Sequence, residues 1–429
     1  MWQDLRDFKK HDGHTAPQAD HPWAGGCMRS GSPLRSELRA KTMVKEVVTP
    51  IFQFGTSRFL QAHAALFVHE ALQAGDAAGP ITVAAISGSV VGRARLQALA
   101  RDEGYPVVIR GLEKGQRVEH EIGVKSIRRA LDAELDWSRL TTLFAVQAEF
   151  VVSNTTEAGL TIPSDLVVDL TSGAGPAPAG YPAKLLVLLA HRFAVSARPV
   201  VLLPTELVQR NGDTLKEVLI VLAKRSGASD ALLSFIADDC VFANSLVDRI
   251  VSSAIEPVGA IAEPYALWAI EWQAGLRLPC RHPAIALVGD LERIERLKLH
   301  ILNLGHTVLA QCWMDDGLRS GLTVREILEL GRYRNLLTEI YGSEVIPGFK
   351  ARGMEQEATA YVVTTLERFD NPFLDHRLSD IAAGHLIKVQ RRIGGFLRWV
   401  PEERRRHSPS LANILSAADE NADRQDVVQ

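Results

Sequence analysis

From Val47 onward, short apolar runs rich in β-branched residues alternate with longer segments whose apolar residues recur at three- and four-residue steps. This alternation predicts parallel strands joined by crossover helices, because each helix carries the chain back across one face of the sheet. The predicted strands are residues 51–54, 81–86, 150–153 and 199–203. The predicted helices are residues 59–73, 93–101, 183–193 and 215–225.

The pattern changes twice along the chain. Residues 1–42 are polar and rich in His, Gly and Pro, which predicts a disordered N-terminal extension, with Met43 as a natural start for the folded part. After about residue 290, long amphipathic segments predominate and strand patterns are few. We therefore expect an α/β fold, with a Rossmann-like doubly wound sheet domain over residues 43–289 and a mostly α-helical C-terminal domain over residues 290–429.

Composition limits the classes of partner. The 429 residues carry a net charge of -3, so the chain has no general attraction to nucleic acid or to an anionic membrane. No apolar run reaches the roughly 18 residues that span a bilayer. The sequence contains four cysteines, which are scattered without metal-ligand spacing: Cys27, Cys240, Cys280 and Cys312. This pattern argues against a metal site and favours a reducing cytoplasm. We expect a small-molecule substrate and a monomer or small homo-oligomer.

The first strand-to-helix connection, "QFGTSRF", has only part of a dinucleotide-binding pattern. The G-x-G-x-x-G pattern lets the backbone approach a pyrophosphate, and here Gly55 is present while Ser57 and Leu60 occupy the other two glycine positions. The segment is either a cofactor site or an ordinary connection. On the first reading, the cofactor-binding residues are Gly55, Thr56, Ser57, Arg58 and Phe59.

Two further strand ends are candidates for cofactor contacts, because ligands bind at the carboxyl ends of parallel strands. The third predicted strand ends in Ser153, Asn154 and Thr155, whose small polar side chains suit a nicotinamide ribose or amide, or simply begin a helix. The second strand leads to Ser87 and Arg93 without the acidic residue typical of NAD sites, so these side chains are also candidates for the 2′-phosphate of NADP.

Lys298, Asn303 and His306 are the candidate catalytic residues, in the segment "KLHILNLGHT". At 100° per residue, Asn303 lies about 140° from Lys298 around a helix and His306 lies between them at about 80°. A lysine is a suitable general base toward an alcohol, and an amide with an imidazole suits the polarisation of the reacting oxygen. The alternative is structural, with Lys298 solvated, Asn303 at a kink and His306 in the core.

The chain resembles the polyol-specific long-chain dehydrogenase/reductase (mannitol dehydrogenase) family in "RLKLHILNLGHT", "NSLVDRIV" and "RFDNPFLDH". The resemblance implies metal-independent hydride transfer with Lys298 as acid/base, and Asn303 and His306 on the reacting oxygen. It also implies a Gly-x-Gly-x-Phe turn at Gly55, with Ser57 in place of the second glycine, and favours NAD, with NADP also open. The implied substrate-side residues are Glu206, Asp248 and Lys388.

Several stretches resemble the tagaturonate reductase (altronate oxidoreductase) branch, among them "VVSNTTEAGL" and "PTELVQRNGDTL". Mannitol-type enzymes have an asparagine near Glu206 and an arginine at the position of Asp380, so both positions disfavour mannitol itself. A hexuronate also needs cationic or amide partners for its carboxylate, which Glu206 and Asp380 do not supply and for which the sequence offers Lys388, Arg391 and Arg58. A neutral or lactone substrate is the alternative.

We therefore expect an NAD(P)-dependent oxidoreductase that interconverts a sugar acid alcohol and its keto form, with altronate and tagaturonate as the leading pair. The alternatives in the same class are a fructuronate (mannonate) reductase and a polyol dehydrogenase acting on mannitol or arabinitol. An alternative of another class is a non-catalytic dinucleotide-binding redox sensor.

Overall fold

The computed structural model describes residues 47–86, 90–171 and 175–426, and residues Thr49–Gln429 form one compact unit. Predictions for residues 1–42, Met43, Cys27 and Ser87 lie outside the described residues.

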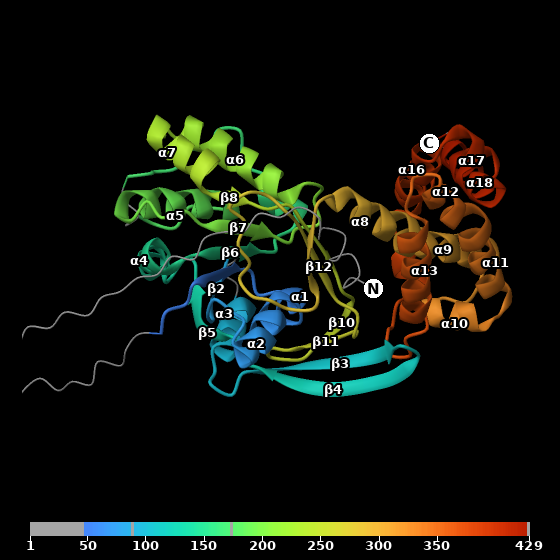
Figure 1. Ribbon diagram of the computed structural model, residues 1–429, viewed down its shortest axis with the longest axis horizontal. Helices are drawn as coiled ribbons and strands as arrows, with labels where there is room; N and C mark the ends of the chain where they lie inside the picture. Colours follow the sequence, from blue (N-terminus) through green and yellow to red (C-terminus); the bar gives the residue numbers. More distant parts are fainter. Residues whose placement is uncertain (1–46, 87–89, 172–174, 427–429) are drawn as a thin grey trace, which may run out of the picture. The chain divides into compact units, whose positions relative to one another are not determined.

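A six-stranded parallel sheet forms the first part of the unit, as the alternating pattern predicts (Figure 1). β1 and β6 have the predicted bounds, whereas β2 ends one residue earlier and β7 is shifted toward Pro204. Four of these strands are buried throughout: β1, β2, β6 and β7. They appear in the sequence as continuous apolar runs because both faces are covered. In order across the sheet, the strands are β5 (Ile127–Asp132), β2 (Ile81–Ala85), β1 (Ile51–Phe54), β6 (Phe150–Ser153), β7 (Val201–Pro204) and β8 (Val241–Phe242).

Helices cover both faces of this sheet (Figure 1). Ile51 of β1 packs in one hydrophobic cluster with α2 and α3, whereas its neighbour Phe52 packs in a second cluster with α4, α5 and α6. The alternation follows from the strand period of two. The helices are α2 (Ala64–Ala74), α3 (Val90–Leu99), α4 (Trp137–Gln147), α5 (Tyr181–Val195), α6 (Asn211–Arg225) and α7 (Asp230–Ser234).

The prediction of a single helix over residues 59–73 is wrong in one respect. The helix is interrupted at Ala62 and His63, which separate a short α1 (Arg58–Gln61) from α2. Two side chains from distant parts of the sequence donate hydrogen bonds to the carbonyl groups at this interruption. Arg249 Nη1 donates to the Ala62 carbonyl at 2.7 Å, and the Tyr105 hydroxyl donates to the Gln61 carbonyl at 3.1 Å. These tertiary contacts stabilise the break, and local periodicity does not reveal them.

Two smaller sheets were not predicted from the sequence. One has the order β10-β11-β3-β4 and the other the order β13-β12-β9. β4 is mostly exposed and polar, so it has no apolar alternation to reveal it. The strands are β3 (Tyr105–Glu113), β4 (Gln116–Val124), β9 (Ser245–Asp248), β10 (Val251–Ala254), β11 (Ala260–Ala262), β12 (Leu267–Glu271) and β13 (Ile285–Val288).

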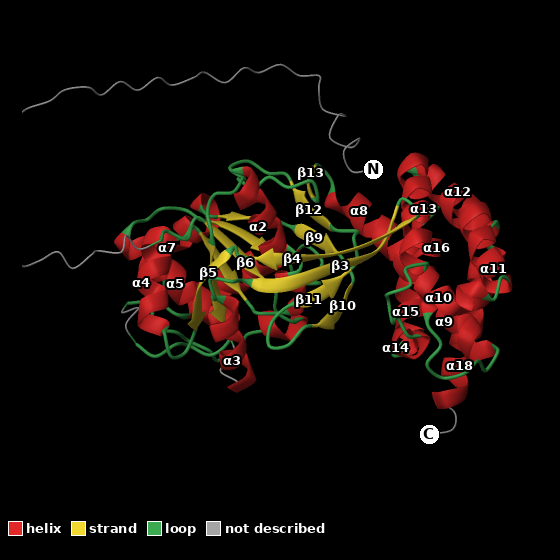
Figure 2. Ribbon diagram, turned by 90° about the horizontal axis from the view of Figure 1, so that it is seen from below, coloured by secondary structure: helices red, strands yellow, loops and turns green. Residues whose placement is uncertain are grey.

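Beyond β13 the described residues are helical, apart from turns and one isolated bridge between Thr323 and Arg377, as Figure 2 shows. The predicted helical C-terminal part is thereby confirmed. Three π-helical turns interrupt these helices: η4 (Lys298–Asn303), η5 (Tyr341–Val345) and η6 (Gln390–Gly394). The α-helices are α8 (Leu291–Leu297), α9 (Leu304–Asp315), α10 (Val324–Glu329), α11 (Arg332–Ile340), α12 (Ile346–Lys350), α13 (Glu355–Phe369), α14 (Leu378–Ala382), α15 (His385–Val389), α16 (Gly395–Trp399), α17 (Glu402–Arg406) and α18 (Pro409–Asp426).

Candidate functional site

The turn after β1 requires its single glycine. Gly55 has a φ of 116°, a conformation that side chains disfavour, and a Cβ there would lie 3.1 Å from the Asn154 carbonyl oxygen. Ser57 caps α1, since its Oγ accepts a hydrogen bond from the Leu60 amide at 3.2 Å. The backbone therefore turns tightly at the carboxyl end of β1, beside the loop that follows β6.

Asn154 joins the loops that follow three neighbouring strands. Its Oδ1 accepts from Ser57 Oγ at 3.1 Å, after β1, and its Nδ2 donates to the Thr205 carbonyl at 3.1 Å, after β7. The predicted cofactor residues Ser57 and Asn154 are thus in direct contact. Together these loops form the carboxyl edge of the sheet, where ligands bind in such folds.

Glu206 is buried at this edge and supports the loop after β6. Its carboxylate accepts from Ser153 Oγ at 3.2 Å and from the Thr155 amide at 3.0 Å. Burial raises its pKa, and these hydrogen bonds oppose the shift. The carboxylate of Glu206 thus contacts two predicted cofactor residues, Ser153 and Thr155.

The remaining predicted cofactor residues have different surroundings. The Thr56 carbonyl accepts from Gln61 Nε2, Arg58 is exposed, and Phe59 stacks on His63 with ring centroids 4.7 Å apart. Arg93, the candidate for a 2′-phosphate, lies 3.9 Å from the Asp132 carboxylate.

The candidate catalytic helix departs from the geometry assumed for it, because Lys298–Asn303 is a π-helical turn. The amide of Leu304 reaches back five residues to the Leu299 carbonyl. The angle of about 140° calculated for an α-helix is therefore wrong across this turn, since a π-helix has more residues per turn and so less than 100° per residue. A wider turn therefore reduces the angle between Asn303 and Lys298 around the helix axis.

Lys298 is held at the end of β9. Its Nζ donates to the Val247 carbonyl at 2.8 Å and lies 3.6 Å from the Asp248 carboxylate. β9 is in turn fixed to the main sheet, because Asn211 Nδ2 donates to the carbonyls of both Glu206 and Ser245, at 3.1 and 2.9 Å. Hydrogen bonds thus join the Lys298 amine to β9, and β9 to the carboxyl edge of the main sheet.

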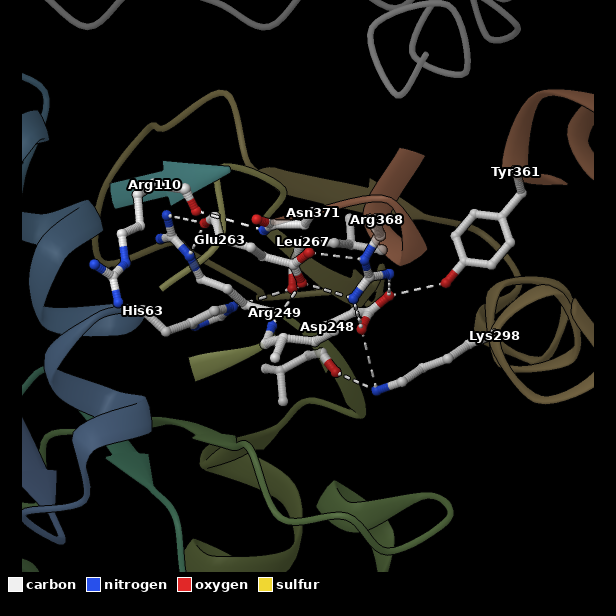
Figure 3. Close-up of polar contacts among 12 residues, drawn as sticks. His63, Arg110, Asp248, Arg249, Glu263, Leu267, Lys298, Tyr361, Arg368 and Asn371 are labelled. Carbon is white, nitrogen blue, oxygen red and sulfur yellow. Dashed lines mark hydrogen bonds and ion pairs between the residues drawn. The ribbon is translucent and has the colours of Figure 1, made fainter. Parts of the chain in front are cut away.

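Asp248 lies in a buried charge cluster (Figure 3). Arg368 donates to its two oxygens at 2.8 and 3.1 Å, and the Tyr361 hydroxyl donates to it at 2.9 Å. Burial alone would raise the pKa of Asp248, but the positive charges of Arg368 and Lys298 outweigh burial and hold it well below its usual range. Asp248 is therefore a carboxylate that faces the Lys298 amine.

The sequence singled out Asp248 but not its partners Arg368 and Tyr361, nor the second acid, Glu263. Arg368 also donates to the Glu263 carboxylate at 3.0 and 2.8 Å, so one guanidinium bridges two buried acids. The available signal was the arginine that opens "RFDNPFLDH", at the end of an otherwise amphipathic helix. Its burial depends on segments 105 and 120 residues earlier in the chain, which no local pattern reveals.

His306 is buried, and its Nε2 has no hydrogen-bond partner among the described residues. Its ring centroid lies 4.5 Å from that of Phe369 and 4.6 Å from that of His376. Burial, followed by the positive charges of neighbours including Arg392 and Lys388, holds its pKa well below the usual value. The imidazole is therefore neutral, which leaves one ring nitrogen as a donor and one as an acceptor.

Two cations lie near His306. Lys388 Nζ donates to the Ile381 carbonyl at 2.8 Å, and Arg392 Nη1 donates to the Asn303 carbonyl at 3.2 Å. Burial and the charge of Arg392 lower the pKa of Lys388. Neither cation has a carboxylate partner within the described ranges. Asp380 and Arg391 are exposed.

Family models match the chain in two consecutive segments. Residues 49–278 match the mannitol dehydrogenase Rossmann domain, and residues 290–418 match the mannitol dehydrogenase C-terminal domain. The chain belongs to the mannitol dehydrogenase family. It is an oxidoreductase that acts on CH–OH groups with a nicotinamide dinucleotide, and the predicted family and reaction class are confirmed.

Curated relatives in this family include altronate oxidoreductases. That of Halalkalibacterium halodurans is 30% identical over 365 residues, which cover 80% of this chain and 69% of the relative. That of Bacillus subtilis is 28% identical over 368 residues, covering 80% and 73%. These relatives support a polyol or sugar acid dehydrogenase.

Solved structures confirm the fold. D-sorbitol dehydrogenase in substrate-free form has a TM-score of 0.66 and 22% identity, covering 80% of this chain and 74% of that chain. Mannitol 2-dehydrogenase of Pseudomonas fluorescens, in a ternary complex with NAD and D-mannitol, has a TM-score of 0.62 and 17% identity, covering 87% and 79%. Among the described residues of this chain, no helix has the length and apolar character to cross a membrane, and no group of three or more His, Cys, Asp or Glu is arranged for a metal ion.

Proposed function

We propose that this enzyme interconverts altronate and tagaturonate with NAD. The supporting observation is the position of the Lys298 amine, which contacts both Val247 and Asp248 at the end of a strand tied to the carboxyl edge of the sheet. We assign cofactor binding to residues 43–289, around the Gly55 turn, and catalysis to residues 290–429. A bound nicotinamide supplies the acceptor for the substrate's hydride.

In alcohol oxidation, Lys298 takes the hydroxyl proton while the hydride leaves the carbinol carbon. The Asp248 carboxylate, 3.6 Å from Nζ, stabilises the positive charge that Lys298 gains. The Asn303 amide and the neutral His306 imidazole donate hydrogen bonds to the reacting oxygen. In the reverse reaction Lys298 returns the proton to the forming alkoxide.

A sugar acid is favoured over a neutral polyol by the cations near His306. Lys388 and Arg392 are partly buried and close enough for the charge of Arg392 to lower the pKa of Lys388. The two neighbouring cations have no carboxylate partner among the described residues, so their repulsion destabilises the protein. An anionic substrate offsets this repulsion. We therefore assign the substrate carboxylate to Lys388 and Arg392. Arg58 and Arg391, the other candidates, are exposed.

NAD is favoured over NADP by the surroundings of Arg93. Its guanidinium lies 3.9 Å from Asp132, whose carboxylate would repel a 2′-phosphate bound at the same place. We also propose a reducing cytoplasm as the working compartment, because Cys240, Cys280 and Cys312 are free thiols.

The test is a spectrophotometric screen of the purified protein. Tagaturonate, fructuronate, fructose and pentuloses are each mixed with NADH or NADPH, and oxidation of the reduced cofactor is followed. We expect the highest kcat/KM with tagaturonate and NADH. Reduction of fructose without any uronate would assign the enzyme to neutral polyols, and fructuronate as the best substrate would assign it to mannonate. Saturable cofactor binding without turnover would support a redox sensor instead.

A further inference from the structure

The wide turn that carries Lys298 and Asn303 depends on partners outside its own helix. Within η4 the Leu304 amide reaches back to the Leu299 carbonyl and also contacts the Ile301 carbonyl. A π-turn is uncommon because it disturbs the regular backbone pairing of the α-helices that flank it, and such turns occur frequently at functional sites. Carbonyl groups displaced in this way need other donors when they are buried.

Tyr341, at the start of η5, supplies one of those donors. Its hydroxyl donates to the Ile301 carbonyl at 2.8 Å, and both residues are almost fully buried. Burial raises the pKa of the Tyr341 phenol far above its usual value, so the hydroxyl remains a neutral donor. The contact joins two π-turns that lie 40 residues apart in the sequence.

Gly305 makes room for that hydroxyl. A Cβ at this position would lie 2.0 Å from the Tyr341 oxygen and 3.1 Å from its Cζ. The backbone of Gly305 is helical and does not itself require glycine. The glycine of "NLGHT" is therefore explained by the approach of Tyr341 to the turn.

A second clamp comes from η6. Arg392 Nη1 donates to the Asn303 carbonyl at 3.2 Å and to Thr307 Oγ1 at 3.0 Å. The Arg392 carbonyl in turn accepts from His300 Nδ1 at 2.9 Å. These bonds hold both the middle and the end of the wide turn against η6.

We propose that Tyr341, Gly305 and Arg392 are positioning residues that keep this turn five residues wide, so that Asn303 faces the same side as Lys298. The proposal rests on the assigned roles of Lys298 and Asn303 in the proposed function. Tyr341 and Gly305 act only through the turn, without touching substrate. If the clamp is lost, the segment relaxes toward an α-helix, in which these two side chains lie about 140° apart.

The first test removes only the Tyr341 hydroxyl. Tyr341→Phe should lower kcat about tenfold, as expected for the loss of one buried hydrogen bond that orients a catalytic pair, and should leave the KM for substrate and the Kd for cofactor nearly unchanged. Tyr333→Phe is the matched control, because it removes a hydroxyl that donates to Asp316 at 2.6 Å from the neighbouring helix α11. Equal kcat values for the two variants would overturn the proposal.

The second test is a double-mutant cycle. Gly305→Ala should lower kcat by more than Tyr341→Phe, because the new methyl group displaces the Tyr341 ring. The double variant lacks the Tyr341 oxygen that the new methyl group would meet. Its kcat, expressed as a fraction of the wild-type value, should therefore be higher than the product of the fractions measured for the two single variants. Independent, multiplicative effects would contradict a shared role for Gly305 and Tyr341.

A structural readout separates this proposal from the proposed function. Hydrogen exchange followed by mass spectrometry should show faster exchange in residues 298–307 of Tyr341→Phe, whichever substrate the enzyme uses. A wild-type protein that turns over none of the screened substrates would defeat the proposed function while leaving this measurement intact. Exchange in residues 298–307 that matches the wild type and Tyr333→Phe would defeat the clamp.

Discussion

Arg368 donates two hydrogen bonds to Asp248, at 2.8 and 3.1 Å, from a fully buried position at the end of α13. Its other two bonds go to Glu263, so the planar guanidinium satisfies two carboxylates that would otherwise repel each other. The cluster joins α13 to β9 and to the segment after β11. Asp248 can face Lys298 as a stable anion because Arg368 supplies the neutralising charge.

Arg368→Met should therefore destabilise the protein strongly. Removing the guanidinium leaves two buried carboxylates without a cation, and breaking a buried pair in this way costs about 3–5 kcal/mol. The free energy of unfolding, measured by denaturant titration, checks the value. Arg334→Met is the control, since Arg334 pairs with Asp370 at a partly exposed site where the loss should be below about 1 kcal/mol. Similar losses for both variants would contradict the role given to Arg368.

Lys298→Ala tests the acid/base assignment. The loss of a positioned proton-transfer group should lower kcat about 10²- to 10⁴-fold, while cofactor binding and the melting temperature change little. Lys216→Ala is a matched control, because Lys216 also donates to a backbone carbonyl, that of Ala237, and lies on α6. Stopped-flow measurement of cofactor oxidation gives both rates. Turnover of Lys298→Ala close to that of the control would exclude Lys298 as the acid/base.

The sequence predicted four of the six strands of the main sheet, because those four are buried on both faces, but it did not predict the partly exposed β5 or the two-residue β8. It also did not predict β4, whose exposed polar residues have no periodicity, or β9. β9 nevertheless carries Asp248. The resemblance in "NSLVDRIV" singled out this aspartate, whereas propensity alone did not reveal the strand beneath it.

The candidate site was predicted in part. Lys298, Asn303 and His306 were expected to share a regular helix and to face one cleft. The π-turn at Lys298–Asn303 was not predicted, because the turn depends on Tyr341 and Arg392, 40 and 89 residues farther along the chain. Arg368 was missed for the same reason, since its partners are distant in sequence. Local patterns specify which residues are available, and long-range contacts decide how they face one another.

Lys388→Met tests the assignment of the substrate carboxylate. If Lys388 binds that group, its loss should weaken the binding of altronate about ten- to a hundredfold and leave the binding of the neutral alditol altritol nearly unchanged. Titration calorimetry without the cofactor, so that no substrate is turned over, measures both constants. Arg391→Met is the control, because Arg391 is an exposed cation three residues away. Equal weakening for altronate and altritol would show that Lys388 contacts a hydroxyl group instead.

His300 should make stability depend on pH. It is buried within the wide turn, its Nδ1 donates to the Arg392 carbonyl at 2.9 Å, and its ring stacks on Trp399. Burial lowers its pKa from 6.5 to about 4, and the hydrogen bond to Arg392 only partly opposes this. Between these two values the unfolded chain binds a proton that the folded chain does not. The contribution of the neutral ring to the free energy of unfolding is therefore fully present above pH 6.5 and is lost as the pH falls toward 4.

His300→Asn should remove this contribution. Asparagine retains an N–H donor for the Arg392 carbonyl but does not titrate, so the slope of unfolding free energy against pH should fall by about 1.4 kcal/mol per pH unit between pH 4 and pH 6.5. Denaturant unfolding at a series of pH values measures the slope. His407→Asn, at an exposed histidine on the C-cap of α17, is the control variant. An unaltered slope in His300→Asn would mean that His300 is protonated alike in the folded and unfolded chains.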